Sequence, residues 1–212
     1  GHGLQHMLTT VDYPGASGIN NVEWDAVELP SQFMENWCYD RSTLFGMAKH
    51  YENGETLPEH YYQKILASRN YMSGTAMLRQ IHFSSVDLEL HHRYQPGGKE
   101  TVNDVRQRIA AQTTVLPPLP EDAFLCSFGH IFAGGYAAGY YSYKWAEVLS
   151  ADAFSRFEEE GIFNTQTGAD FLHAILEQGG SREAMALFTE FRGRKPEVDA
   201  LLRHSGITQT ES

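Results

Sequence analysis

Apolar residues recur at helical spacing through most of the chain, and no segment alternates apolar and polar positions between hairpin turns. This pattern predicts an all-α protein. The expected helices cover residues 22–39, 57–67, 74–91, 101–111, 135–157, 170–177, 182–191 and 196–204, with an aromatic segment at 124–132. A serine pair at 84–85 is expected to make the third helix irregular.

Prolines and glycines mark the breaks between these helices. The clearest break is the proline-rich loop 116–120, because proline lacks an amide donor and fixes φ. The run 95–99 has two interpretations, a domain linker or a tight turn between helices. Its shortness and the unchanged composition around it favour the turn. We therefore expect one domain over residues 1–212.

The two ends of the chain have different characters. Residues 1–4 run directly into an apolar pattern with no preceding turn or capping residue, which predicts a chain that begins inside a helix. Residues 201–206 are typical of a helix that closes at a glycine, and a short polar tail follows. We expect the natural C-terminus at this end and a missing segment before Gly1.

Composition and charge limit the functional classes. With 212 residues and 42% hydrophobic content, the chain can bury one sizeable core or two small ones. A formal net charge of -11 argues against a nucleic-acid partner. No apolar run approaches the roughly 20 residues that cross a bilayer, so no membrane partner is expected. Cys38 and Cys126 lack disulfide-type spacing, which favours two thiols in a cytoplasmic protein.

A histidine and a glutamate are candidate metal ligands. In gluzincin-type peptidases, a helix with the pattern H-E-x-x-H supplies two imidazoles, and a later Glu completes three protein ligands. Gly1 and His2 would be the last two residues of such a motif, and Glu28 the later acid. Taken alone, a terminal His and a helical Glu are each more often ordinary surface groups than metal ligands. Asp25, one turn before Glu28, is either a partner for a ligand imidazole's second nitrogen or a solvated helix acid.

The second candidate region is rich in glycine and tyrosine. Gly134 and Gly135 allow close backbone approach or positive φ, which suits a loop that pairs with an extended peptide. Tyr136, Tyr140 and Tyr143 have the i, i+4, i+7 spacing of one helical face. A phenol stays protonated near neutral pH and can donate to a developing oxyanion. The alternative for these rings is an aromatic core stripe.

Four segments together resemble the M3 family of zinc oligopeptidases, the oligopeptidase A and thimet oligopeptidase group. They are 1–8 (GHGLQHML), 17–37 with its DAVELPSQFMENW stretch, 128–145 (FGHIFAGGYAAGYYSYKW) and 191–204. The resemblance spans essentially the whole chain. It departs from the family pattern at Gln5, where members often carry His, although His6 lies beside it. It implies the C-terminal part of a neurolysin-like helical catalytic domain, beginning inside the H-E-F-G-H motif.

The resemblance also implies residue roles. His2 and Glu28 would hold one Zn²⁺, with Asp25 behind the ligands; cobalt or manganese could occupy the same site in vitro. The implied catalytic residues are His130, Tyr136 and Tyr143, and the implied substrate-binding residues are Gly134, Gly135 and Tyr140.

The implied activity is hydrolysis of internal bonds in short oligopeptides. The first His ligand and the general-base Glu would precede Gly1, as would a helical region that forms the other wall of the channel. We therefore expect the chain alone to be inactive and to need the upstream part of the enzyme as its partner. Three alternatives stay open: a dipeptidyl carboxypeptidase, a non-catalytic helical remnant that binds peptides, and a structural protein with a coincidental His and Glu.

Overall fold

The computed structural model describes residues 1–208, and these residues fold into two compact units. Unit 1 combines Gly1–Tyr71 with the chain from Trp145 onward, and unit 2 is Met72–Lys144. Within the described residues the backbone forms helices and turns, with one isolated bridge between Lys49 and Thr56 and no strand. The predicted all-α class is confirmed. The single domain expected over residues 1–212 stays a prediction.

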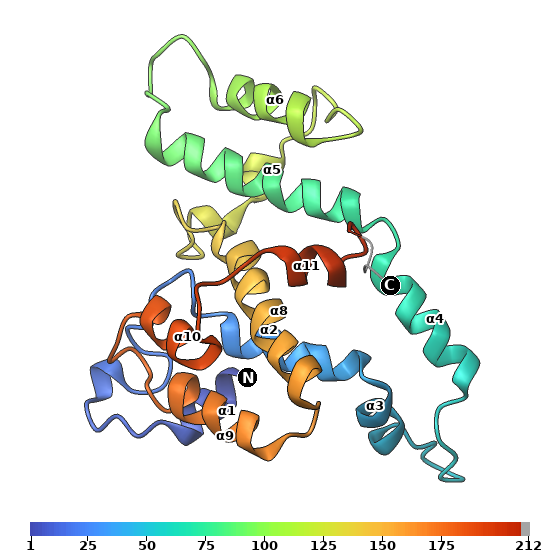
Figure 1. Cartoon of the computed structure of the whole chain (residues 1–212). Helices are drawn as coiled ribbons and strands as arrows, with labels where there is room; N and C mark the ends of the chain where they lie inside the picture. The colour runs from blue at the N-terminus through green and yellow to red at the C-terminus, as the bar shows by residue number, and fades with distance from the viewer. Residues whose placement is uncertain (209–212) are drawn as a thin grey trace. The chain divides into compact units, whose positions relative to one another are not determined.

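Unit 1 contains most of the long helix α8 together with shorter helices (Figure 1). Its elements are α1 (His2–Leu8), η1 (Pro14–Ala16), α2 (Leu29–Glu35), η2 (Asn36–Tyr39), α3 (Arg41–Met47), α4 (Glu59–Asn70), α8 (Ser142–Glu160), α9 (Thr165–Phe171), η4 (Leu172–Leu176), α10 (Ala184–Arg192) and α11 (Asp199–His204). The first three residues of α8 belong to unit 2.

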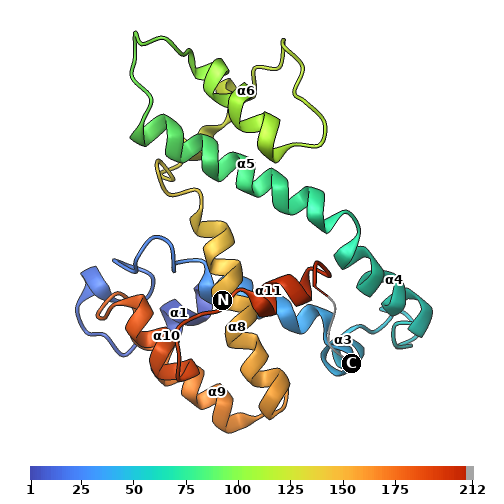
Figure 2. The same cartoon turned by 45° about the horizontal axis from the view of Figure 1, so that its top comes forward.

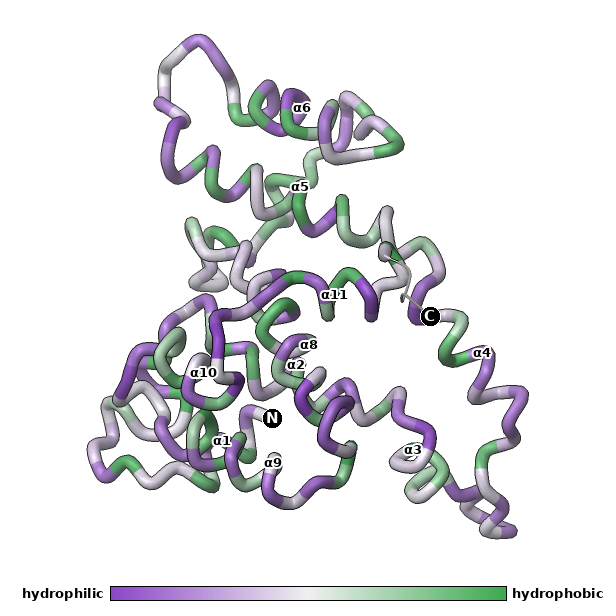
Figure 3. The backbone as a smooth tube through the Cα atoms, in the orientation of Figure 1, coloured by the Kyte–Doolittle hydropathy of each residue, from purple (hydrophilic) through white to green (hydrophobic). Residues whose placement is uncertain are grey.

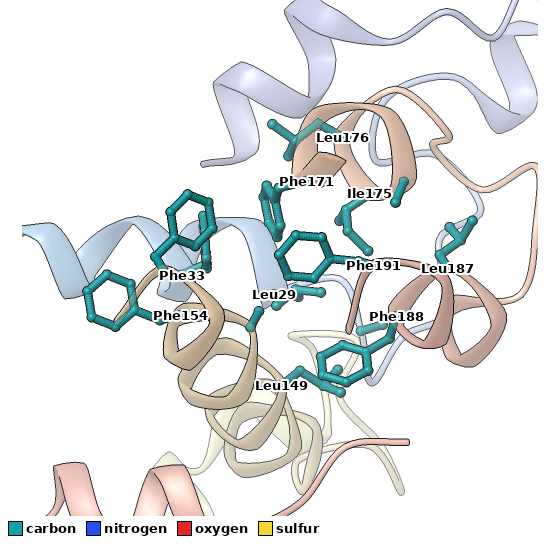
Figure 4. Packing of buried hydrophobic residues seen from close by; sticks show 14 residues of the cluster. Leu29, Phe33, Leu149, Phe154, Phe171, Ile175, Leu176, Leu187, Phe188 and Phe191 are labelled. Carbon is teal, nitrogen blue, oxygen red and sulfur yellow. The ribbon is translucent and has the colours of Figure 1, made fainter. Parts of the chain in front are cut away.

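The core of unit 1 is aromatic and lies between α2, α8, α9, η4 and α10 (Figure 4). The rings of Phe33 and Phe171 stack with centroids 4.0 Å apart, and Phe33 also meets Phe157 at 5.6 Å. Phe188 is 1% exposed. Helix α1 packs against α2 and η4. This core therefore fixes the position of α1 relative to the start of α2.

Unit 2 is a helical hairpin followed by a compact loop. It contains α5 (Ser73–His92), α6 (Val102–Thr113), α7 (Phe124–Ser127) and η3 (Gly129–Ile131). Helices α5 and α6 lie side by side (Figure 2) and bury Val86, Val105 and Ile109 between them. A second apolar cluster joins Phe83 of α5 to Phe128, Ile131 and Tyr140.

Polar and apolar stretches alternate along the described chain (Figure 3). None of the helices within residues 1–208 combines the length and the apolar character that crossing a membrane requires.

The helix expected over residues 22–39 is wrong in its first part, because α2 begins only at Leu29. Residues before it form turns in which Ala26 N–H donates to Glu23 and Leu29 N–H donates to Ala26, at 2.9 and 3.0 Å. Pro30 has no N–H, so the carbonyl of Ala26 cannot accept an i→i+4 bond. The proline instead occupies the first turn of α2, where the missing donor costs nothing.

The hairpin helices agree well with the predicted spans. Helix α5 runs unbroken through the serine pair, and Ser84 Oγ donates to the carbonyl of Gln80 at 2.9 Å, a bond compatible with helix. Thr101 caps α6 through a reciprocal capping box with Asp104. The helix expected over residues 170–177 is instead the end of α9 followed by the π-helical turn η4.

Candidate active site

In unit 1 the two predicted metal ligands meet at the contact of α1 and α2. His2 is the first residue of α1, and Glu28 immediately precedes α2. The atoms His2 Nε2 and Glu28 Oε2 lie 3.1 Å apart, although the residues are 26 positions apart in sequence. The His2 side chain is 40% exposed and that of Glu28 is 17% exposed.

Local contacts fix the orientation of Glu28. Ser31 Oγ donates to Glu28 Oε2 at 2.9 Å and also lies 3.0 Å from the carbonyl oxygen of Glu28. A Cβ on Gly1 would lie 2.0 Å from the carbonyl oxygen of Pro30, so only glycine permits this approach of α1 to α2. The pairing of His2 with Glu28 thus depends on a small residue and a hydroxyl from the same two helices.

The donor set of this pair fits Zn²⁺. An imidazole nitrogen and a carboxylate oxygen are both common zinc ligands, with bonds of about 2.0–2.2 Å. Two ligand atoms on a tetrahedral zinc would then lie about 3.3 Å apart, close to the 3.1 Å between His2 Nε2 and Glu28 Oε2. Within residues 1–208, no group of three or more His, Cys, Asp or Glu side chains is arranged to hold a metal ion.

The other nitrogen of His2 faces inward. Nδ1 is buried and has no hydrogen-bond partner among the described residues. Asp25, predicted to orient a ligand imidazole, therefore makes no hydrogen bond to Nδ1 of His2. Its predicted role toward a ligand stays a prediction.

In unit 2 the predicted aromatic residues form one cluster. The rings of Tyr136 and Tyr143 stack with centroids 4.7 Å apart, and those of Tyr140 and Tyr143 meet edge to face at 5.2 Å. The His130 ring lies 6.1 Å from that of Tyr136 and 6.2 Å from that of Tyr143. His130 is exposed, and Tyr136 and Tyr143 are half-buried. The structure therefore brings together the four rings that the sequence pattern selected.

The prediction that the three tyrosines share one helical face is wrong. The predicted helix 135–157 begins only at Ser142, so Tyr136 and Tyr140 precede α8. The segment before it consists of tight turns, in which Gly139 N–H donates to Tyr136 and Ser142 N–H donates to Gly139 at 2.8 and 3.1 Å. A folded loop, not helical periodicity, gathers the phenols.

The two glycines build the first turn of this loop. Gly135 has φ of 82°, the left-handed region that disfavours other residues. A Cβ on Gly134 would lie 2.8 Å from the Cα of His130. Gly134 N–H donates to the carbonyl of Gly129 at 2.8 Å, so this donor is used within the loop. Their predicted contact with substrate stays a prediction.

Tyr140 is more buried than its predicted role as a flanking substrate contact suggested. It is 8% exposed, packs among Phe83, Phe128 and Ile131, and its phenol donates to Gln80 Oε1 at 3.2 Å. Burial, and then the neighbouring Tyr143, raise the pKa of Tyr140 above its ordinary value. The phenol accordingly stays neutral across the physiological pH range.

The sequence analysis missed the residue that holds this loop. Asp87 of α5 is fully buried and accepts the backbone N–H groups of Ala138 and Tyr140, each at 2.9 Å. The available signal was its position: it falls among Phe83, Val86 and Leu90 at helical spacing, on the apolar face of α5. Acids are rarely buried without partners, so an acid on that face indicates a specific role.

An all-helical chain that pairs His with Glu at the contact of two helices, and carries a His–Tyr cluster on a glycine loop, has the features of a metallopeptidase. Residues 1–207 match the family model described as peptidase family M3. The chain belongs to this family, and the resemblance is confirmed.

Three of the relatives that match the chain are oligopeptidases A, and each alignment covers 98% of the chain. It is 62% identical to the organellar (chloroplastic/mitochondrial) oligopeptidase A of Arabidopsis thaliana. It is 61% identical to the probable cytosolic oligopeptidase A of the same plant and 54% identical to oligopeptidase A of Escherichia coli K12. The chain spans 27% of the length of the first relative and 30% of each of the others.

Proposed function

We propose that this chain supplies part of the catalytic site of a zinc oligopeptidase that hydrolyses internal bonds of short peptides. The observation that carries the proposal is the 3.1 Å approach of His2 Nε2 to Glu28 Oε2 in a chain of peptidase family M3. The oligopeptidase A names of relatives at 54–62% identity support the same reaction class.

The proposed metal ligands are His2 and Glu28. When bound by these residues, Zn²⁺ would supply a Lewis acid for the peptide carbonyl and would lower the pKa of water. Ser31 donates to the Glu28 carboxylate and keeps its Oε2 directed at His2. Asp25 is proposed to orient a ligand imidazole.

The proposed transition-state contacts come from the aromatic cluster. Tyr136 and Tyr143 donate hydrogen bonds from their phenol groups to the oxygen of the attacked carbonyl, and His130 contacts the substrate backbone. Gly134, Gly135 and Tyr140 are proposed to line the substrate path. A neutral phenol suits this role because it donates a hydrogen bond without changing its charge during the reaction.

Activity is proposed for a protein that contains this chain together with further residues. Three protein ligands and a general base are needed for the chemistry, and residues 1–212 offer the pair His2 and Glu28. We expect no hydrolysis by residues 1–212 alone. A cytoplasmic location is proposed as well, and fractionation of cells that express the whole protein tests it.

The test is mass spectrometry of a short unstructured peptide incubated with the full-length gene product. We expect internal cleavage that stops on chelation and returns with Zn²⁺. Release of C-terminal dipeptides alone would favour a dipeptidyl carboxypeptidase, and binding without cleavage would favour a peptide-binding remnant. No cleavage and no binding by a folded, zinc-supplemented protein would reject the proposal.

A matched pair of variants assigns the metal. Glu28→Gln should lower zinc content and reduce kcat/KM by at least the roughly 10–100-fold that loss of an outer-shell partner causes. Glu23→Gln, the same change at an exposed acid on the same segment, should leave both unchanged. Equal zinc content in the two variants would remove Glu28 from the ligand set.

A further inference from the structure

The buried carboxylate of Asp87 in unit 2 contacts two backbone N–H groups and one imidazole. Its Oδ1 accepts the N–H of Ala138 and its Oδ2 accepts the N–H of Tyr140, each at 2.9 Å. His91, one turn further along α5, places Nδ1 2.8 Å from Asp87 Oδ1 and 2.9 Å from the Asp87 carbonyl oxygen. Both of these oxygens are acceptors, so Nδ1 carries the proton and donates.

The segment that Asp87 holds, residues 138–140, has an unfavourable backbone conformation. Ala138 has φ of 57°, in the left-handed region that a Cβ disfavours. Its N–H and that of Tyr140 are directed at the fully buried Asp87 carboxylate, and Tyr140 also packs with Phe83 and Ile131. Without a carboxylate, the Tyr140 donor would be left unpaired in an apolar setting and the Ala138 donor would lose its partly buried partner.

These two hydrogen bonds lie between Tyr136 and Tyr143 in the sequence. One holds the backbone between Tyr136 and Tyr140, and the other holds Tyr140 itself, whose ring meets Tyr143 at 5.2 Å. The stacking of Tyr136 on Tyr143 at 4.7 Å therefore depends on a loop whose path α5 sets. The acid that accepts the N–H of Ala138 lies 51 positions earlier in the sequence.

We propose that Asp87, oriented by His91, is the positioning residue for Tyr136 and Tyr143 in the proposed peptidase reaction. The proposal rests on the proposed function, because it assigns those phenols to the transition state. Asp87 itself is fully buried and touches no reacting atom. Its loss should therefore weaken transition-state contacts, which appear in kcat, more than substrate binding, which appears in KM.

The test uses the full-length, zinc-loaded enzyme and an internally quenched peptide. Asp87→Asn keeps the size of the side chain but replaces one acceptor with an NH₂ group that opposes a backbone donor. We expect kcat to fall about 10–100-fold, as for a small misplacement of catalytic groups, with KM and zinc content unchanged.

A double-mutant cycle separates positioning from general destabilisation. If Asp87 acts through the two phenols, Asp87→Asn should cost less activity in a Tyr136→Phe background than in the wild type, because only the Tyr143 contact is then left to lose. The matched control is Asp152→Asn, a second buried acid that lies in unit 1 and is 1% exposed. Any loss that it causes should add fully to that of Tyr136→Phe.

His91 provides a second route if Asp87→Asn fails to fold. The His91 side chain is 27% exposed, so His91→Ala should be tolerated while it removes the orienting donor. We expect a severalfold fall in kcat that His91→Gln, which retains a donor, restores. Hydrogen exchange at the amides of Ala138 and Tyr140 should accelerate in His91→Ala, a readout independent of activity.

The outcomes distinguish the two proposals. A wild-type enzyme that cleaves no peptide rejects the proposed function and the positioning role with it. An active enzyme in which Asp87→Asn folds with unchanged kcat, or loses activity additively with Tyr136→Phe, rejects the positioning role alone. Unchanged kcat and unchanged amide exchange in His91→Ala reject it as well.

Discussion

At the scale of single residues, the candidate site depends on donors and acceptors that meet from distant parts of the sequence. Tyr136 illustrates this, because its ring stacks on Tyr143 only through the path of the loop between them. Its phenol is proposed to donate to the oxygen of the attacked carbonyl. Removing the hydroxyl alone tests that assignment without emptying the cluster.

Tyr136→Phe should reduce kcat by about 10²–10³-fold, the usual cost of one oxyanion donor. The ring remains, so zinc content and folding should not change. Steady-state kinetics on the full-length enzyme provide the measurement, and Tyr71→Phe, at an exposed tyrosine, is the control. A variant as active as wild type would remove Tyr136 from the catalytic set.

Asp152 is a structural counterpart to Asp87. It is 1% exposed and accepts hydrogen bonds from Arg192 and Arg194 and from the N–H of Glu197. Burial acts to raise its pKa, but the bonds from Arg194, Glu197 and Arg192 outweigh burial and hold the pKa below its ordinary 3.8. Asp152 therefore ties the end of α10 and the segment after it to α8.

This depressed pKa fixes the sign of a pH effect. The stabilisation is present above the unfolded-state pKa of 3.8 and is lost as the pH falls through the lower folded-state value. At pH 7, Asp152→Asn should lower the free energy of unfolding by about 2 kcal/mol. Urea titrations at several pH values should show this difference shrinking below about pH 4. A constant difference down to pH 2 would contradict the assignment.

At the scale of elements, local sequence signals work where a helix end carries its own partners. Thr101 and Asp104 satisfy each other's backbone donors at the start of α6, within four residues of sequence. Helix α8 begins at Ser142, after a segment of turns. There the preceding amides of Ala138 and Tyr140 bond to α5 instead of continuing a helix.

Thr101→Ala should destabilise unit 2 by about 1 kcal/mol, because the N-terminal amides of α6 lose their side-chain acceptor. Thr101→Ser keeps the hydroxyl and should recover most of this loss. Thermal unfolding gives the magnitude, and hydrogen exchange should accelerate in the first turn of α6. Identical stability of the alanine and serine variants would exclude the capping box as a stabilising contact.

At the scale of the whole molecule, each compact unit has its own apolar core. The core of unit 1 includes Phe188 of α10, which is 1% exposed and packs with Leu149 and Phe191 (Figure 4). Such a side chain leaves a cavity when it is truncated, because the surrounding rings cannot close fully around the space.

Phe188→Ala should therefore cost about 3–5 kcal/mol of unfolding free energy. Phe163→Ala, at a ring that is 64% exposed, should change it little. Urea denaturation followed by circular dichroism gives the comparison. A small effect at Phe188 would mean that this core is loosely packed in solution.

The sequence by itself determined the features that local chemistry controls. Helical periodicity predicted α5 and α6 almost to their ends, and the motifs around His2, Glu28 and Gly134 identified the family. These predictions succeed because apolar spacing, helix caps and sequence motifs each depend on residues that are close together in the sequence.

Only the tertiary structure decided how the phenols are gathered and where two helices begin. The path of residues 135–141 depends on Asp87, far away in sequence, and helix spacing alone predicted the wrong geometry for Tyr136 and Tyr140. The position of Asp87 on an apolar helix face indicates a buried acid but not its partners, because a hydrogen bond between distant segments forms only after both segments have packed.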